Sequence, residues 1–140
     1  MPLYGITSNK KIAPANKQKI ANLFTTAHCS IMIAPEQFVH VIFSDGIPLI
    51  DNKSLYVHAN VRVGRSKKQI DELCKAVTKG CADILQIEED KIHIHLMEIP
   101  GKWAMEGGHV MPDPGEEDEW MEKVTKALAE RENESISETV

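Results

Sequence analysis

Hydrophobic and polar positions along the chain form a strand-like pattern and then a helical pattern, and this order occurs twice. The short segment 3–7 reads as a strand, and 55–59 repeats it 52 positions later. After each strand, apolar residues recur at helical spacing and predict a helix with one apolar face. These residues are Ile20, Leu23, Ala27 and Ile31 in the first helix, and Ile70, Leu73, Val77, Cys81 and Ile84 in the second.

Local signals support the helix starts and the strands that follow. Pro14 suits the first position of the first helix, and Ser66 suits the N-cap of the second. Each helix leads into a β-branched, largely alternating segment, 38–43 or 92–97, which predicts a further strand. We therefore expect two β-α-β units that share one four-stranded sheet, with both helices on one face, in an α/β (α+β) fold.

The last third of the chain has a different character. Segment 100–115 is rich in glycine and proline and predicts a loop that folds over the sheet. Segment 116–130 is acidic and then amphipathic, and includes Trp120 and Val124, which indicates a short helix. From 131 to 140 the chain is polar and lacks core residues. We therefore expect a single domain over 1–130 and a flexible tail.

The composition and charge of the chain argue against some classes of function and location. A net charge of −5, with no basic cluster beyond 65–68, argues against a nucleic-acid partner. No apolar run approaches the roughly 20 residues that a membrane span requires, and the N-terminus lacks the apolar stretch of a secretory signal. Cys29, Cys74 and Cys81 fall inside helical patterns without a CxxC pair, which favours packed, reduced thiols. We expect a cytoplasmic protein with no membrane partner.

Pro2 stands at the head of the first predicted strand. Removal of Met1, which is usual before a small residue, would leave a secondary amine at the N-terminus. Burial and nearby cationic groups both disfavour the ammonium form, so this amine would lose its proton more easily than a free amine. It could then act as a general base or acid near neutral pH. The alternative is a proline after the start methionine with no chemical role.

Arg62 and Arg65 lie just beyond the third predicted strand, where the chain turns into the second helix. Two guanidinium groups near a helix N-terminus form a strong carboxylate site, because arginine binds a carboxylate through two hydrogen bonds and the free N–H groups of the helix add to the attraction. The alternative is a pair of solvated surface arginines.

Glu106 and His28 are two further candidates. Glu106 precedes Gly107 and Gly108, where the backbone can come close to a ligand, and its carboxylate could take a proton from water. His28 lies one residue off the apolar face of the first helix and would contact a ligand. The alternatives are an exposed loop glutamate and a packed boundary histidine.

His93 and His95 project from one face of the last predicted strand, because strand side chains alternate with period two. With His58 or His40 nearby they raise the question of a metal site. No acid or cysteine completes a recognisable ligand spacing, so we expect neither a metal nor another cofactor.

Pro2, the doubled β-α-β layout, His28, Arg62 with Arg65, and Glu106 occur together in one known family. The chain resembles the tautomerase superfamily, and most closely its cis-3-chloroacrylic acid dehalogenase-like branch. The resemblance covers residues 2–124 without a large insertion or deletion. The most specific stretches are 58–66 (HANVRVGRS), 105–108 (MEGG) and 112–120 (PDPGEEDEW).

This resemblance implies a role for each residue. Pro2 would be the catalytic amine, acting as general acid, or as base in a tautomerisation. Arg62 and Arg65 would hold the substrate carboxylate and polarise the unsaturated acid, with assistance from His28. Glu106 would activate the water that adds to the double bond. The family forms homotrimers, and association would cover the exposed sheet edges of such a chain.

One position departs from the family pattern. Family dehalogenases pair the glutamate with a tyrosine on the last strand, and His95 aligns there. A histidine can form a hydrogen bond in place of the tyrosine, but its charge and its pKa differ from those of a phenol. We therefore expect tautomerisation or hydration of a small unsaturated or keto carboxylic acid, with at most weak dehalogenation of cis-3-haloacrylates. The alternatives are decarboxylation of a semialdehyde or 3-oxo acid, and a non-catalytic binding module on the same scaffold.

Overall fold

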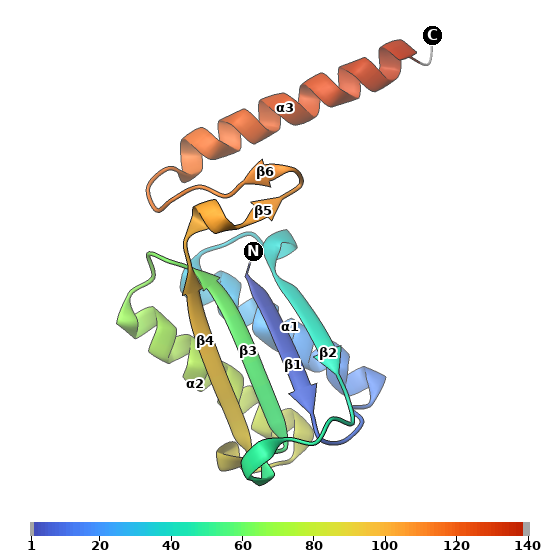
Figure 1. Cartoon of the computed structure of the whole chain (residues 1–140), viewed down its shortest axis with the longest axis vertical. Helices are drawn as coiled ribbons and strands as arrows, with labels where there is room; N and C mark the ends of the chain where they lie inside the picture. The colour runs from blue at the N-terminus through green and yellow to red at the C-terminus, as the bar shows by residue number, and fades with distance from the viewer. Residues whose placement is uncertain (1, 139–140) are drawn as a thin grey trace. The chain divides into compact units, whose positions relative to one another are not determined.

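A computed structural model of the chain describes residues 2–138 (Figure 1). These residues divide into two compact units, one ending at Glu98 and the other beginning at Ile99. No helix in the described part of the chain is long and apolar enough to cross a membrane.

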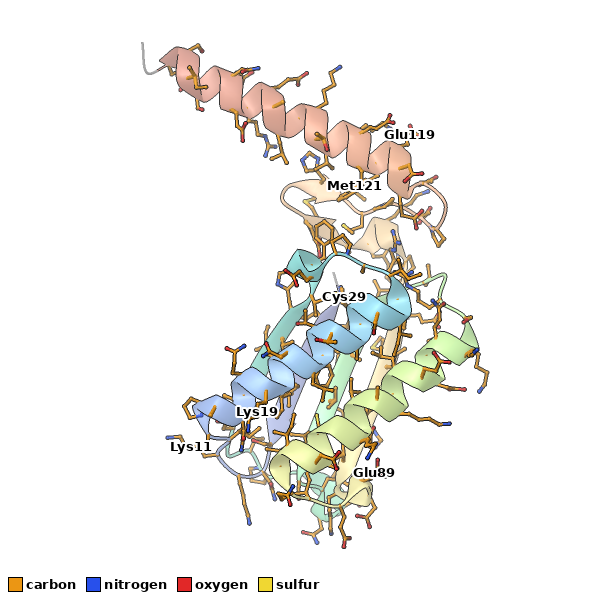
Figure 2. The ribbon with its side chains drawn as sticks, turned by 180° about the vertical axis from the view of Figure 1, so that it is seen from behind. Lys11, Lys19, Cys29, Glu89, Glu119 and Met121 are labelled. Atoms are coloured by element: carbon orange, nitrogen blue, oxygen red, sulfur yellow. The ribbon has the colours of Figure 1, made fainter. Side chains whose placement is uncertain are left out.

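The first unit contains a four-stranded sheet in the order β2-β1-β3-β4 and two helices. Strand β1 pairs in parallel with β2 and antiparallel with β3, and the arrows of β3 and β4 point the same way in Figure 1. Both helices lie on one face of the sheet, as the view from behind in Figure 2 shows. The predicted pair of β-α-β units is therefore confirmed. The bounds are β1 Leu3–Ser8, α1 Pro14–Met32, β2 His40–Ser44, β3 Leu55–Arg62, α2 Lys67–Leu85 and β4 Ile92–Ile99.

Helix α2 begins where the sequence predicts. The Ser66 hydroxyl accepts a hydrogen bond from the backbone N–H of Gln69 at 3.1 Å, and the Gln69 side chain accepts one from the N–H of Ser66 at 2.9 Å. This reciprocal capping box satisfies two N–H groups that the helix itself leaves without partners. Helix α1 begins at Pro14, whose missing N–H costs nothing at a first helical position.

The core lies between the sheet and the two helices. Alternate residues of β1 and β3 point into it, because strand side chains alternate with period two. The buried apolar side chains of this core are Tyr4 and Ile6 on β1, Ile12 before α1, Ile20, Phe24, Ala27 and Met32 on α1, Leu55, Val57, Ala59 and Val61 on β3, Leu73, Val77, Cys81 and Ala82 on α2, and Ile92 on β4.

The buried face of α1 differs from the predicted one. Leu23 and Ile31 are only half-buried, and Phe24, His28 and Met32 are buried instead. The reason is the second helix, since Leu23 packs beside Gly80 of α2, where an added Cβ would collide with the leucine side chain. Leu23 therefore packs between the two helices. The face of α1 that contacts the sheet is displaced by one residue from the predicted face.

The second unit contains a hairpin followed by a helix. Strand β5 (Met105–Glu106) pairs antiparallel with β6 (His109–Val110). Gly107 and Gly108 between them have φ of 57° and 83°, the left-handed region that a tight two-residue hairpin turn requires. Segment 100–115, predicted as a loop, thus contains this hairpin and a 3₁₀ turn over Gly101–Trp103. Whether it folds over the sheet stays a prediction.

Helix α3 (Glu117–Glu138) is longer than predicted. The prediction ended the helix at 130 because the chain from 131 onward is polar and lacks core residues, and it assigned 131–140 to a flexible tail. Residues 131–138 contain no glycine or proline to end the helix, and their glutamates and arginine have favourable helix propensity. The helix start is tied to the hairpin, because the Trp120 indole donates a hydrogen bond to the Val110 carbonyl at 2.6 Å.

Candidate active site

Pro2 is buried directly before β1. Its carbonyl accepts a hydrogen bond from the backbone N–H of His40 at 3.1 Å, which fixes the start of β1 against β2. The burial pattern continues with Tyr4, so both residues belong to the face of β1 that meets the helices. The predicted removal of Met1 concerns a residue outside those that the structure describes.

His28 and Tyr4 form a buried pair on the face of β1 to which Pro2 also belongs. The Tyr4 hydroxyl lies 2.6 Å from His28 Nδ1, and the two residues are 1% and 2% exposed. Burial, and then the positive charge of Arg65, lower the pKa of His28 to about 4. His28 is therefore neutral at pH 7. The sequence had placed it one residue off the apolar face, whereas the structure places it on the buried face.

The two arginines lie at the end of β3 and the entrance to α2. Arg62 is the last residue of β3, and the antiparallel register of β3 with β1 pairs Asn60 with Leu3. The Arg62 end of β3 therefore runs alongside the start of β1. Arg65 directly precedes the N-cap of α2, and its charge acts on both Tyr4 and His28. Both arginines are half-buried, so they are not freely solvated surface charges.

The structure thus gathers Pro2, Tyr4, His28 and Arg65 at one end of the layer between sheet and helices. Arg62 ends the adjacent strand β3, at a position of the sheet face opposite the helices. A secondary amine here would stand near a guanidinium group and a neutral imidazole. Such a site suits a small anion whose charge meets the arginines while its reacting carbon meets the amine.

His95 lies on the other face of the sheet. Its ring centroid is 5.8 Å from that of His58, and His93 stacks on Tyr56 at 5.2 Å. These side chains belong to the open face, by which we mean the face of the sheet opposite the two helices. Within one chain the sheet separates His95 from the Tyr4–His28 pair. Among the described residues no group of three metal-ligating side chains could hold a metal ion.

Glu106 belongs to the second unit, where it ends β5 and pairs with His109 of β6. It is half-buried and is therefore not the freely exposed loop glutamate of the alternative reading. Its approach to Pro2 stays a prediction.

Tyr4 is the residue of this site that sequence reasoning missed. It was assigned to the first strand without a chemical role. The signal was present, because residues 2 and 4 of an extended segment share one face. What the sequence did not show was the turn of α1 that brings His28 to this tyrosine.

One solved structure is similar to this chain in both sequence and fold. N1, a member of the cis-3-chloroacrylic acid dehalogenase (cis-CaaD) family, is 30% identical, with 92% of this chain and 96% of that chain covered and a TM-score of 0.80. Two further structures show the fold alone at 18% identity and a TM-score of 0.70. They are Pt0534 inactivated by 2-oxo-3-pentynoate (78% and 94% covered) and the F6 fused 4-OT wild-type asymmetric trimer (77% and 94%).

No protein-family model and no curated protein sequence matches the chain. The likeness to N1 extends over almost the whole of both chains and includes both units of the fold. It confirms the family resemblance seen in the sequence. This chain belongs to the cis-3-chloroacrylic acid dehalogenase family of the tautomerase superfamily.

Proposed function

We propose that the protein is a cofactor-independent enzyme that uses the amine of Pro2 as a general acid or base on a small unsaturated or keto carboxylic acid. The observation that carries this proposal is the arrangement of buried Pro2, the buried Tyr4–His28 pair and the half-buried Arg65 at one end of the core. Tautomerisation or hydration is the reaction that such a set supports best.

The amine acquires its reactivity from its surroundings. Once Met1 is removed, the nitrogen of Pro2 is a secondary amine at a buried position. Burial and the nearby positive charge of Arg65 both disfavour a second cation, so the amine gives up its proton more readily than a free one. In a tautomerisation the neutral amine takes a proton from one atom of the substrate and returns it to another.

The arginines hold the substrate. Arg65 and Arg62 would bind the carboxylate, and bidentate hydrogen bonds would fix its orientation toward Pro2. His28 contributes as a neutral donor beside them, because a second protonated group is disfavoured in this buried, cationic site. Orientation of the reacting carbon within reach of the amine is the main catalytic gain expected from the site.

Hydration would need a second base. Glu106 is our candidate for activating water, and His95 takes the place of the tyrosine that family dehalogenases pair with this glutamate. His95 projects from the open face, so a site on the opposite side of the sheet would receive it from a neighbouring copy of the chain. With a histidine in this role, we do not expect efficient dehalogenation of cis-3-haloacrylates.

We further propose that the protein assembles as a homotrimer and works in the cytoplasm. The open face of the sheet carries exposed apolar side chains, Ile42 and Met97, that association would cover. One solved structure of the same fold is a fused 4-OT trimer. The three cysteines are free thiols, which suits a reducing compartment.

The experiment has two parts. The mass of the purified native chain shows whether Met1 is removed. Product analysis with an arylpyruvate enol, an acetylenic acid, a 3-oxo acid and a cis-3-haloacrylate then separates tautomerisation, hydration, decarboxylation and dehalogenation. We expect enol–keto turnover to dominate. Retention of Met1, or binding of these acids without turnover of any of them, would favour the non-catalytic binding module.

A further inference from the structure

The Tyr4–His28 pair is a polar contact inside an otherwise apolar layer. The Tyr4 ring packs against Phe24 with 4.8 Å between centroids and meets the His28 ring edge-on at 5.8 Å. The hydroxyl lies 2.6 Å from His28 Nδ1, within the range of a short hydrogen bond. A buried polar pair needs such a bond, because an unpaired hydroxyl or imidazole nitrogen is costly there.

The direction of this hydrogen bond follows from the groups available. Among the described residues, His28 is the one hydrogen-bond partner that the Tyr4 hydroxyl has. If His28 donated, the phenolic proton would be buried without an acceptor, which is unfavourable. If Tyr4 donates, its proton is satisfied and only lone pairs of its oxygen stay unused. Burial also raises the pKa of the phenol well above its usual range, so the proton is present to be donated.

Donation by Tyr4 sets the tautomer of His28. A neutral imidazole carries one proton, and Nδ1 cannot hold it while it accepts a hydrogen bond from Tyr4. The proton is therefore on Nε2. Among the described residues Nε2 has no hydrogen-bond partner, so the hydrogen-bonding capacity of this N–H is unused within the chain.

The tautomer of His28 determines whether a bound anion faces an N–H group or a lone pair. With the proton on Nε2, His28 presents an N–H to a carboxylate or enolate oxygen that also faces Arg65. With the proton on Nδ1, the same ring would direct a lone pair at that anion and repel it. The charged or titratable groups that act on the pair are Arg65, the N-terminal ammonium, Cys29 and Cys74.

We propose that Tyr4 is a positioning residue that holds His28 in the tautomer protonated on Nε2, so that this N–H is the donor for the anionic substrate. The substrate role rests on the proposed function, whereas the tautomer is a property of the protein alone. The two are therefore tested separately.

The tautomer is measured by ¹⁵N NMR of the substrate-free protein at pH 7. We expect His28 Nδ1 to show the signal of a hydrogen-bonded, unprotonated nitrogen and Nε2 that of an N–H. Tyr4→Phe removes one oxygen and keeps the ring against Phe24, so the fold is retained while Nδ1 moves to the signal of a free lone pair or the tautomers mix. Tyr56→Phe is the matched control, because the chain has two tyrosines and Tyr56 lies on the open face.

Turnover then tests the positioning role. We expect Tyr4→Phe to lower kcat/KM for an arylpyruvate enol about five- to tenfold, the effect of one hydrogen bond. In a His28→Ala background the same substitution should have no further effect, because Tyr4 acts through His28. A merely structural role predicts an equal loss in both backgrounds.

Three results would overturn the proposal. The first is a wild-type His28 protonated on Nδ1, and the second is an Nδ1 signal that Tyr4→Phe leaves unchanged. The third is an additive loss of kcat/KM in the double variant. If the tautomer is as expected but the wild-type protein turns over no acid, the proposed function fails while the assignment of the tautomer to Tyr4 stands.

Discussion

Arg65 is the residue that joins the carboxylate hypothesis to the buried pair. It precedes the N-cap of α2, and its charge reaches Tyr4 and His28 on two other elements. A guanidinium group in such a half-buried position loses little solvation when it takes up a carboxylate, and the N-terminal end of α2 favours the same anion. The same charge opposes protonation of His28. The two effects together select a neutral imidazole beside an anion-binding arginine.

Replacement of either arginine tests the substrate anchor. We expect Arg62→Ala and Arg65→Ala each to cost about 2–5 kcal/mol of transition-state stabilisation, because one partner of a desolvated, hydrogen-bonded charge pair is removed. Steady-state kinetics on an arylpyruvate enol measure the loss in kcat/KM. Lys68→Ala is the control for a general change of charge, since this lysine side chain is 85% exposed. Wild-type kinetics in both arginine variants would show that the pair is surface charge only.

The depressed pKa of His28 predicts a pH dependence of stability. Histidine titrates near 6.5 in an unfolded chain, and burial lowers the pKa of His28 to about 4 in the folded one. Between these values the unfolded chain binds the extra proton, so the stabilisation is complete above about pH 6.5 and is lost as the pH falls toward 4. The loss is on the order of 3 kcal/mol.

Denaturant unfolding of wild type and His28→Gln from pH 7.5 to 4 measures this effect. The other histidines titrate in both proteins, so the difference between the two curves isolates His28. We expect the wild-type free energy of unfolding to fall more steeply with acidification. Parallel curves over the whole range would contradict the buried, neutral state of this residue.

At the scale of elements, the sequence predicted most of the sheet and missed some details of the helices. Strands and the capped start of α2 follow from local signals, such as alternation and the Ser66–Gln69 capping box. The prediction of the buried face of α1 was wrong by one residue. The position of Leu23 depends on its contact with α2, which no local sequence pattern reveals. The hairpin at Gly107–Gly108 was missed because two-residue strands carry almost no periodicity.

The candidate site, too, could be predicted only in part from the sequence. Pro2, Arg62, Arg65 and Glu106 could be named from residue type, local position and family resemblance. The contact of His28 with Tyr4 could not, because it depends on the rotation of α1 about its axis.

The contact between Leu23 and Gly80 offers a test of the packing of α1 on α2. In an isolated helix Gly→Ala gains about 1 kcal/mol, but a Cβ at position 80 would collide with the Leu23 side chain. We therefore expect Gly80→Ala to destabilise the wild type and to stabilise a Leu23→Ala background. The free energies of unfolding of the four proteins measure this coupling. An equal effect of Gly80→Ala in both backgrounds would show that the two positions do not touch.

At the scale of the whole molecule, the open face is the surface that needs a partner. It carries Ile42, at 57% exposure, which pairs with Gly5 of β1 in the parallel register. Such a face suits a heterologous contact that closes a ring of copies, and a contact there would also deliver His95 to a neighbouring chain. Assembly and completion of the site would then depend on the same surface.

Light scattering tests this assembly. We expect a mass of three times the 15.7 kDa chain at micromolar concentration. Ile42→Lys places a charge on the open face and should shift the protein toward monomer, with loss of turnover. Ile136→Lys, an exposed position on α3, is the matched control and should leave the mass unchanged. A monomeric wild type would count against the trimer.

The central claim is that the amine of Pro2 performs the proton transfer, and one comparison tests it most directly. Turnover of an arylpyruvate enol is measured for Pro2→Ala and for Pro14→Ala, a proline at the exposed first position of α1. Both variants are first shown by mass to lack Met1, so that each begins at residue 2. We predict that Pro2→Ala loses activity, because a primary amine on a flexible residue does not reproduce the rigid secondary amine, whereas Pro14→Ala keeps it. Full activity in Pro2→Ala would contradict the account.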